Sequence, residues 1–294
     1  MITKKDLKDF LRHLGFSENG NQFTKHFPVI DAYLKVDFTN EQLIYPEDKG
    51  MVANERQTCN FSANENFVVF EAVCRLFEKC YKPEHLELEP KWKLGRGASG
   101  GRADILVKDF NGDSLLIIEC KTPGKEFTQA WKRMLVDGGQ LFSYAQQERT
   151  TKFLCLYTSD FDAGSLTCDN YIITLIDNDR LLEEREAGSS LAYKDAKSTE
   201  DLFKAWKETY AQDYMAVGIF EEDIKPYEIG KSKYTITDLK SVAEKDIQPK
   251  YHEFATILRQ HNVSGRENAF DKLVNLFLCK IVDETQNPSD LQFW

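Results

Sequence analysis

The feature that most constrains this chain is a run of four aliphatic residues, Leu115-Leu116-Ile117-Ile118, followed directly by Glu119-Cys120-Lys121. Such a run predicts a β-strand that is buried on both faces of a sheet. Side chains alternate along a strand, so Glu119 and Lys121 are expected to share one face. Ionised groups are costly to bury alone, so this carboxylate and this ammonium need a metal ion, a substrate or each other.

Glutamate-x-lysine triplets are common in a chain with 29% charged residues, and this chain has three of them. Glu47-Asp48-Lys49 and Glu89-Pro90-Lys91 do not follow a long apolar run, whereas Glu119-Cys120-Lys121 does. Taken alone, an acidic residue and a lysine on one strand face are more typical of a surface ion pair. The position at the end of a buried strand is what points to a functional site.

A second acidic residue is expected beside this triplet. Asp104 opens the predicted strand Ala103–Val107, and Asn111-Gly112, in the connection to the strand Leu115–Lys121, is a strong hairpin signal. The hairpin brings Asp104 next to the glutamate, so two carboxylates and one amine converge at a sheet edge. With the carbonyl of Cys120, the carboxylates can hold magnesium, while the lysine orients the attacking water. The trio predicts Mg²⁺-dependent hydrolysis of phosphodiester bonds.

The surrounding pattern predicts an α/β (α+β) fold with a mixed central sheet flanked by helices. Its core order is helix, three strands, helix and two strands. The expected elements are a helix over residues 62–81, strands Leu86–Leu94, Ala103–Val107 and Leu115–Lys121, a helix Glu126–Gln147 interrupted at Gly138-Gly139, and strands Lys152–Thr158 and Tyr171–Ile176.

The chain is expected to comprise four segments. Residues 1–58 form an extension with a helix Lys4–Leu14 and strands Gln22–Phe27 and Tyr33–Phe38, and residues 59–180 form the core. Residues 181–235 are a charged helical and linker segment, in which Glu221–Lys233 is the linker. Residues 236–294 are helical, with helices over 249–260 and 266–284.

Composition indicates a globular protein of the cytoplasm. The 294 residues contain no apolar run long enough to span a membrane, and the first residues lack the apolar core of a secretion signal. The seven cysteines are expected to be reduced, with Cys74, Cys120, Cys155 and Cys279 in the core because they lie in apolar runs. A net charge of −10 argues against coating by nucleic acid but allows a local DNA groove.

These residues resemble the signature of the PD-(D/E)XK nuclease superfamily, in particular the nuclease domain of type I and type IIG restriction enzymes. The similarity covers residues 60–176 and lies in Gly101–Val107 followed by Glu119-Cys120-Lys121, with Ala103 in place of the eponymous proline. That proline carries no chemistry. The resemblance implies a restriction-endonuclease-like αβββαβ core, with Asp104, Glu119 and the Cys120 carbonyl as metal ligands.

Two further positions fit this family. Gln140 and Tyr144 resemble its QxxxY motif, and their i, i+4 spacing puts them on one helix face near the site or the DNA, although such residues are more often plain surface positions. The family also often places a glutamate of its first helix at the metal. Glu71 is the preferred candidate and Glu65 the second, and a solvated helix face is the alternative for Glu71.

Contacts to DNA are expected from basic residues near the triplet in sequence, namely Arg96, Arg102 and Lys125. For the two arginines, which flank and interrupt a glycine-rich stretch, solvation of a loop is the equal alternative. The stretch lacks the GK[ST] ending of a Walker loop, so it predicts no nucleotide site.

The C-terminal region over 258–284 resembles the helical region that precedes an adenine-N6 methyltransferase in fused restriction-modification enzymes. The chain lacks the methylation motif NPP[YF], because Asn287-Pro288 is followed by Ser289-Asp290, and it lacks a glycine-rich cofactor loop. No methylation is expected from it alone, and we interpret it as the front part of a longer enzyme.

The sequence therefore predicts a magnesium-dependent endonuclease domain of a restriction-modification enzyme that cleaves double-stranded DNA. Its expected partners are a fused or associated N6-adenine methyltransferase and a target-recognition domain. No association with a membrane is expected. Two alternatives stay open at this point. One is a catalytically silent DNA-binding or assembly module, and the other is an RNA-directed or repair nuclease of the same superfamily.

Overall fold

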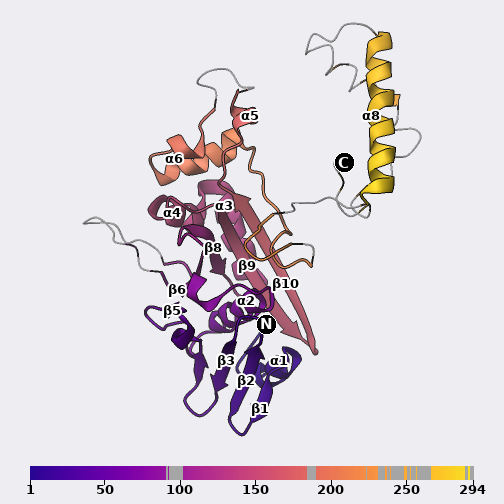
Figure 1. The fold of residues 1–294 in the computed structure, drawn as a ribbon. Helices are drawn as coiled ribbons and strands as arrows, with labels where there is room; N and C mark the ends of the chain where they lie inside the picture. The colour runs from indigo at the N-terminus through magenta and orange to yellow at the C-terminus, as the bar shows by residue number, and fades with distance from the viewer. Residues whose placement is uncertain are drawn as a thin grey trace. The chain divides into compact units, whose positions relative to one another are not determined.

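The computed structural model describes residues 1–90, 92, 102–183, 190–222, 224–230 and 266–288, with single residues between 236 and 291. The chain divides into two compact units, Met1–Gly230 and Lys231–Trp294. The first unit holds two sheets and the helices that cover them (Figure 1). None of the described helices combines the length and the apolar character that crossing a lipid bilayer requires.

A six-stranded mixed sheet forms the centre of the first unit, as the sequence predicts. Its strand order is β10-β9-β8-β7-β6-β5. Neighbours run antiparallel except for β5 with β6 and β8 with β9, which are parallel. The strands are β5 (Val52–Ala53), β6 (Leu86–Leu88), β7 (Ile105–Lys108), β8 (Ser114–Cys120), β9 (Phe153–Asp162) and β10 (Ser165–Thr174).

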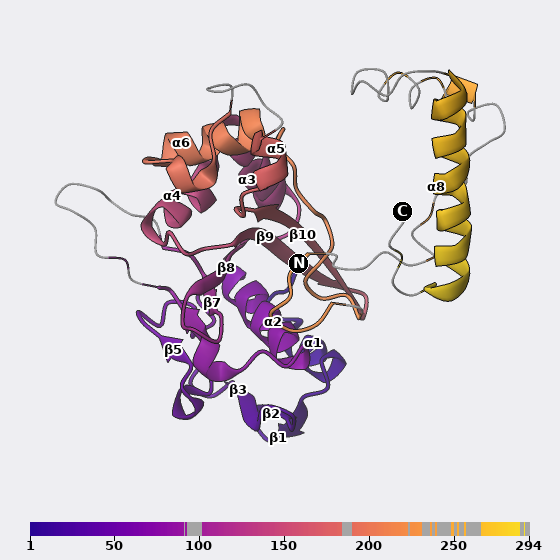
Figure 2. The ribbon, with the colours of Figure 1, turned by 45° about the horizontal axis from the view of Figure 1, so that its top comes forward.

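Helices cover both faces of this sheet, and the two views in Figures 1 and 2 show the layers. Helix α2 (Glu65–Glu78) packs on the face that carries Cys120 and Tyr157. Helices α3 (Lys125–Asp137) and α4 (Gly139–Gln147) pack on the other face. All seven residues of β8 are buried because both of its faces are covered. The prediction of a strand buried on both faces is thus confirmed.

The N-terminal residues form a four-stranded antiparallel meander that shares its apolar core with α2. The sequence predicts its helix and its two longer strands, and the structure adds two short edge strands. The elements are α1 (Leu7–His13), β1 (Ser17–Asn19), β2 (Gln22–Phe27), β3 (Ala32–Asp37) and β4 (Gln42–Ile44). Short 3-10 turns follow at Glu47–Lys49 and, after α2, at Pro83–His85.

The hairpin between β7 and β8 forms where Asn111-Gly112 predicts it. The amide of Gly112 donates to the Asp109 carbonyl at 3.0 Å, and Gly112 has a left-handed φ of +85°. The Asp109 carboxylate accepts the amides of Asn111 and Asp113 at 2.9 and 3.1 Å. This turn fixes the register in which Ile105 pairs with Ile118.

Two strand predictions need correction. The expected strand Leu86–Leu94 ends at Leu88, because Glu89 has a left-handed φ of +52° and precedes Pro90. The expected strands Lys152–Thr158 and Tyr171–Ile176 are instead the inner halves of β9 and β10, which form one long hairpin. Its outer half is rich in polar residues, so the apolar pattern does not reveal it.

The break expected at Gly138-Gly139 is confirmed, since both glycines have positive φ and α4 begins where α3 ends. A Cβ on Gly138 would lie 3.0 Å from Phe142 of α4 and 3.1 Å from Phe203, so these two side chains leave no room for a larger residue at the break. Between β10 and the end of the first unit, the described helical pieces are short: α5 (Asp179–Glu183), a 3-10 turn (Tyr193–Asp195), α6 (Thr199–Lys204) and a π-helical turn (Ala205–Thr209).

The described part of the expected linker Glu221–Lys233 belongs to the first unit. Ile224 is buried, and the Lys79 ammonium donates to the carbonyls of Glu221 and Ile224. In the second unit the described helix is α8 (Arg266–Gln286), and the helix expected over 249–260 lies largely outside the described residues. All seven cysteines are free, as expected, but Cys279 is exposed on α8 rather than in a core.

The hairpin yields a stability prediction. Gly112→Ala is expected to lower the free energy of unfolding by about 1 kcal/mol, because a side chain is disfavoured at a left-handed φ while no neighbour lies close enough to clash. Chemical denaturation measures the change. Asn111→Ala, at a position without positive φ, is the control and should cost less; equal losses for both would contradict the role of backbone strain.

Candidate active site

The predicted trio comes together at the end of β8. Continuing the β7–β8 register by one residue beyond Ile105 and Ile118 places Asp104 opposite Glu119. The Asp104 carboxylate accepts the amide of Cys120 at 2.7 Å, which ties it to the neighbouring strand. The expected convergence of Asp104 with Glu119 and Lys121 is therefore present in the structure.

Lys121 lies between carboxylates. Its ammonium is 2.8 Å from Glu119 Oε1 and 3.3 Å from Glu65 Oε2. It also donates to the Cys120 carbonyl at 2.8 Å, so this carbonyl faces the same point as the acidic groups. The main chain of Lys121 is fixed in turn, because its amide donates to the Tyr157 carbonyl of β9 at 2.9 Å.

Burial shapes the electrostatics of the trio. Glu119 is only 4% exposed, and burial raises the pKa of its carboxyl group against the opposing effect of Lys121. Burial and the nearby charge of Glu119 raise the pKa of Asp104 well above its ordinary value. Burial disfavours the charged form of Lys121, but the carboxylates outweigh it and raise its pKa, so this side chain stays an ammonium at neutral pH.

An open cleft of about 560 Å³ gives solvent access to this point. It runs from the first residue of α2, past the end of β8, to the facing sides of α3 and α4. Acidic side chains outnumber basic ones along it. Its polar lining residues are Glu65, Glu119, Lys121, Glu126, Gln129, Arg133, Asp137 and Gln140.

Both residues of the QxxxY pattern lie on α4, in different settings. Gln140 is exposed and lines the cleft. Tyr144 is fully buried, its hydroxyl donates to the Arg102 carbonyl at 3.0 Å, and burial with the charges of Glu119 and Asp104 raises its pKa. Only Gln140 is therefore open to a substrate in the cleft.

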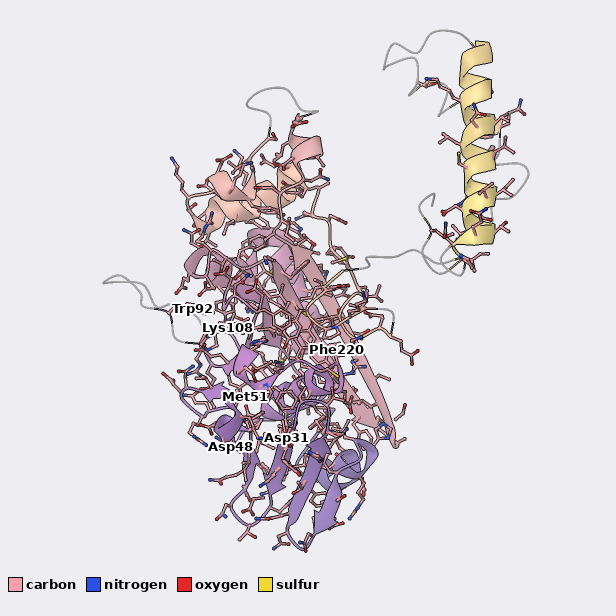
Figure 3. All side chains as sticks on the ribbon, viewed as in Figure 1. Asp31, Asp48, Met51, Trp92, Lys108 and Phe220 are labelled. Carbon is pink, nitrogen blue, oxygen red and sulfur yellow. The ribbon has the colours of Figure 1, made fainter. Side chains whose placement is uncertain are left out.

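The preference for Glu71 as a third ligand needs correction in favour of Glu65. Glu71 is fully buried on the sheet face opposite Glu119, where it accepts the Tyr157 hydroxyl at 2.5 Å and lies 3.6 Å from Arg75. Phe220, labelled in Figure 3, stacks over that arginine. Glu65 starts α2 six residues earlier and reaches the cleft. The sequence holds the signal, since Glu71 follows Phe67 by four residues on the apolar stripe.

The three residues predicted to contact DNA differ in their surroundings. Arg96 is outside the described residues. Arg102 is directed to protein groups: its guanidinium pairs with Glu55 and donates to Gln57 Oε1 at 2.8 Å. Lys125 is exposed at the start of α3 but does not line the cleft. The cleft instead carries Arg133, one of the basic residues close to the triplet in sequence.

The donor set fits a hard divalent cation. Glu119 Oε2 is buried and makes no hydrogen bond among the described residues, although the Tyr144 hydroxyl is close enough to the carboxyl group to oppose the rise of its pKa. A cation bound at this oxygen would offset the cost of burying it. Oxygen ligands on Asp104, Glu119, Glu65 and the Cys120 carbonyl suit Mg²⁺. Within the described part of the chain, no three His, Cys, Asp or Glu side chains already converge at ligand distance, and the Lys121 ammonium lies among the acidic groups.

Two sequence comparisons with known proteins find no match. No protein-family model matches this chain, and no curated protein sequence is similar enough to be matched to it. The chain has two carboxylates and a charged lysine at the end of β8, next to an acidic cleft that is open to solvent. Such a site can bind a divalent cation together with an anionic substrate.

The raised pKa of Asp104 predicts a pH-dependent gain from its removal. When the pKa of an acid is higher in the folded than in the unfolded state, the free energy of unfolding falls as the pH rises from the unfolded-state pKa to the folded-state pKa. Without metal, the free energy of unfolding of Asp104→Asn is therefore expected to exceed that of the wild type at pH 8, because the folded wild type disfavours the ionised carboxylate. This difference in the free energy of unfolding should vanish as the pH falls towards about 4. Urea titrations at several pH values measure it.

Asp109→Asn is the matched control because its sign is opposite. Hydrogen bonds from Lys152 and from two main-chain amides outweigh burial and lower the pKa of Asp109, so its stabilisation exists above the unfolded pKa and is lost in acid. That variant should be less stable than the wild type at pH 8 and equal to it in acid. The same pH trend for both variants would contradict the assignment.

Proposed function

We propose that this chain is a magnesium-dependent endonuclease domain that hydrolyses phosphodiester bonds of double-stranded DNA, within a restriction-modification enzyme. The observation that carries the proposal is the meeting of Asp104, Glu119 and Lys121 at the end of β8, where Glu119 and Lys121 line an open cleft and one buried Glu119 oxygen makes no hydrogen bond among the described residues. The order of helices and strands around the trio, α2-β6-β7-β8-α3-α4-β9, agrees with the αβββαβ core that the sequence resemblance implies.

Each residue of the site would have a distinct role. Asp104, Glu119 and the Cys120 carbonyl would hold Mg²⁺, with Glu65 at the open side. The bound ion would polarise the phosphate and lower the pKa of a coordinated water. Because its pKa is raised, Lys121 remains charged; it therefore donates hydrogen bonds to the attacking water and to the phosphate oxygens rather than removing a proton.

The cleft gives a reason for the metal requirement. Its lining is acidic, so in the absence of a divalent cation it repels a phosphodiester. Arg133 and Gln140 stand at the α3–α4 side, where they can contact the backbone of a bound strand. The restriction-modification setting rests on a different basis, namely the sequence resemblance of residues 60–176 and of the C-terminal helical region.

Removal of the lysine is the first test of catalysis. Lys121→Ala is expected to lower the rate of Mg²⁺-dependent plasmid nicking by at least about 100-fold, because charge on the phosphate is no longer offset. Lys35→Ala, an exposed strand lysine in the other sheet, should keep the wild-type rate. If Lys121→Ala cleaves as fast as the wild type, or if cleavage persists after chelation of divalent ions, the nuclease proposal fails. Circular dichroism checks that each variant is folded.

The choice between the two helix glutamates is a separate test. Glu65→Gln is expected to raise the Mg²⁺ concentration for half-maximal cleavage by about tenfold, because an outer oxygen ligand loses its charge. Glu71→Gln should leave this concentration unchanged, since that carboxylate lies on the opposite face of the sheet. Calorimetric titration of each variant with Mn²⁺ gives the same comparison without DNA. A larger effect for Glu71→Gln would restore the original sequence preference.

A further inference from the structure

Glu89 and Arg102 flank the segment 90–101, and neither has a role in the mechanism above. The Glu89 side chain is 1% exposed, and its carboxylate accepts the amides of Thr58 at 2.5 Å and Glu55 at 3.1 Å. To make these contacts its backbone takes a left-handed φ of +52°, which an ordinary side chain disfavours. Such strain persists only where surrounding contacts hold it.

Arg102 lies at the other end of the segment 90–101 and contacts the same part of the chain as Glu89. Its guanidinium pairs with the Glu55 carboxylate, donates to Gln57 Oε1 at 2.8 Å and lies 3.8 Å from Glu89 Oε2. Its carbonyl accepts the Tyr144 hydroxyl at 3.0 Å, and Trp92, labelled in Figure 3, stacks on the Tyr144 ring with centroids 5.4 Å apart. The arginine thus joins the N-terminal residues 55–57 to α4.

These contacts end at Asp104. The Glu89 amide donates to the Asp104 carbonyl at 3.1 Å, while the Asp104 carboxylate accepts the Cys120 amide at 2.7 Å. Asp104 precedes the first residue of β7, so the regular strand ladder begins only after it. Its main chain is therefore held by the Glu89 amide in addition to the strand register, two residues after Arg102.

We propose that Glu89 and Arg102, held by Glu55, Gln57 and Thr58, form a clamp that positions Asp104 for metal binding. Arg102 is then a positioning residue and not a contact to DNA, and these three residues of the N-terminal extension support the site. The catalytic consequence rests on the proposed nuclease function. The mechanical part, the restraint of Asp104 in the metal-free protein, is independent of it.

Hydrogen exchange measures the mechanical part directly. In metal-free protein, Arg102→Met is expected to speed exchange of the Glu89 and Cys120 amides at least tenfold, because both donate to Asp104. Arg102→Lys, which keeps the charge, should recover part of the protection. Arg56→Met is the control, since Arg56 makes a neighbouring surface ion pair with Glu47 and should leave both amides unchanged. Unchanged exchange in Arg102→Met would overturn the clamp.

Cleavage measurements then separate positioning from DNA contact. Arg102→Met is expected to raise the Mg²⁺ requirement about tenfold, as loss of an outer-shell support does, with the KM for DNA and its salt dependence unchanged. A reduction of the salt-dependence slope of DNA binding by about 0.9 would mark a lost phosphate contact and overturn the proposal. If Arg102→Met does not fold, Glu55→Gln and Glu89→Gln provide the same readouts. A wild type without nuclease activity would sink the proposed function but leave the exchange test valid.

Discussion

The antiparallel register of β7 on β8 is the constraint on which the site depends. It pairs Ile105 with Ile118 and so sets Asp104 opposite Glu119. A shift of one residue would move Glu119 and Lys121 to the α2 face, because side chains alternate along a strand. The Asp109–Asp113 turn specifies the observed register, and a shift is further opposed because it would carry the charges of Glu119 and Lys121 into the apolar layer beneath α2.

Two buried acidic side chains, Glu71 and Glu119, lie on opposite faces of the sheet. Their carboxylates have different surroundings. On one face Glu71 is satisfied by the Tyr157 hydroxyl and by Arg75, which makes it part of the fold. On the other face Glu119 keeps a buried oxygen without a hydrogen-bond partner among the described residues, beside a lysine and an open cleft. This incomplete pairing distinguishes a site that can receive a cation from a structural polar cluster.

Much of the fold follows from local patterns. The buried strand β8, the helix α2, the break at Gly138 and the hairpin at Gly112 were predictable, because each has a strong local cause: an apolar run, a helical stripe or a glycine at positive φ. The outer half of the β9–β10 hairpin was not, because polar residues outnumber apolar ones there and the two strands are ordered by pairing with each other. The early end of β6 likewise depends on amides of a distant segment that capture Glu89.

The sequence by itself determined that a glutamate and a lysine would end a doubly buried strand and that Asp104 would join them, because short-range periodicity and one turn suffice for that. Only the tertiary structure decided which helix glutamate faces the cleft and that Arg102 turns inward to residues 55–57. Both outcomes depend on contacts between segments more than 40 residues apart. Local propensity carries no information about such long-range partners, and only packing of the whole unit selects among them.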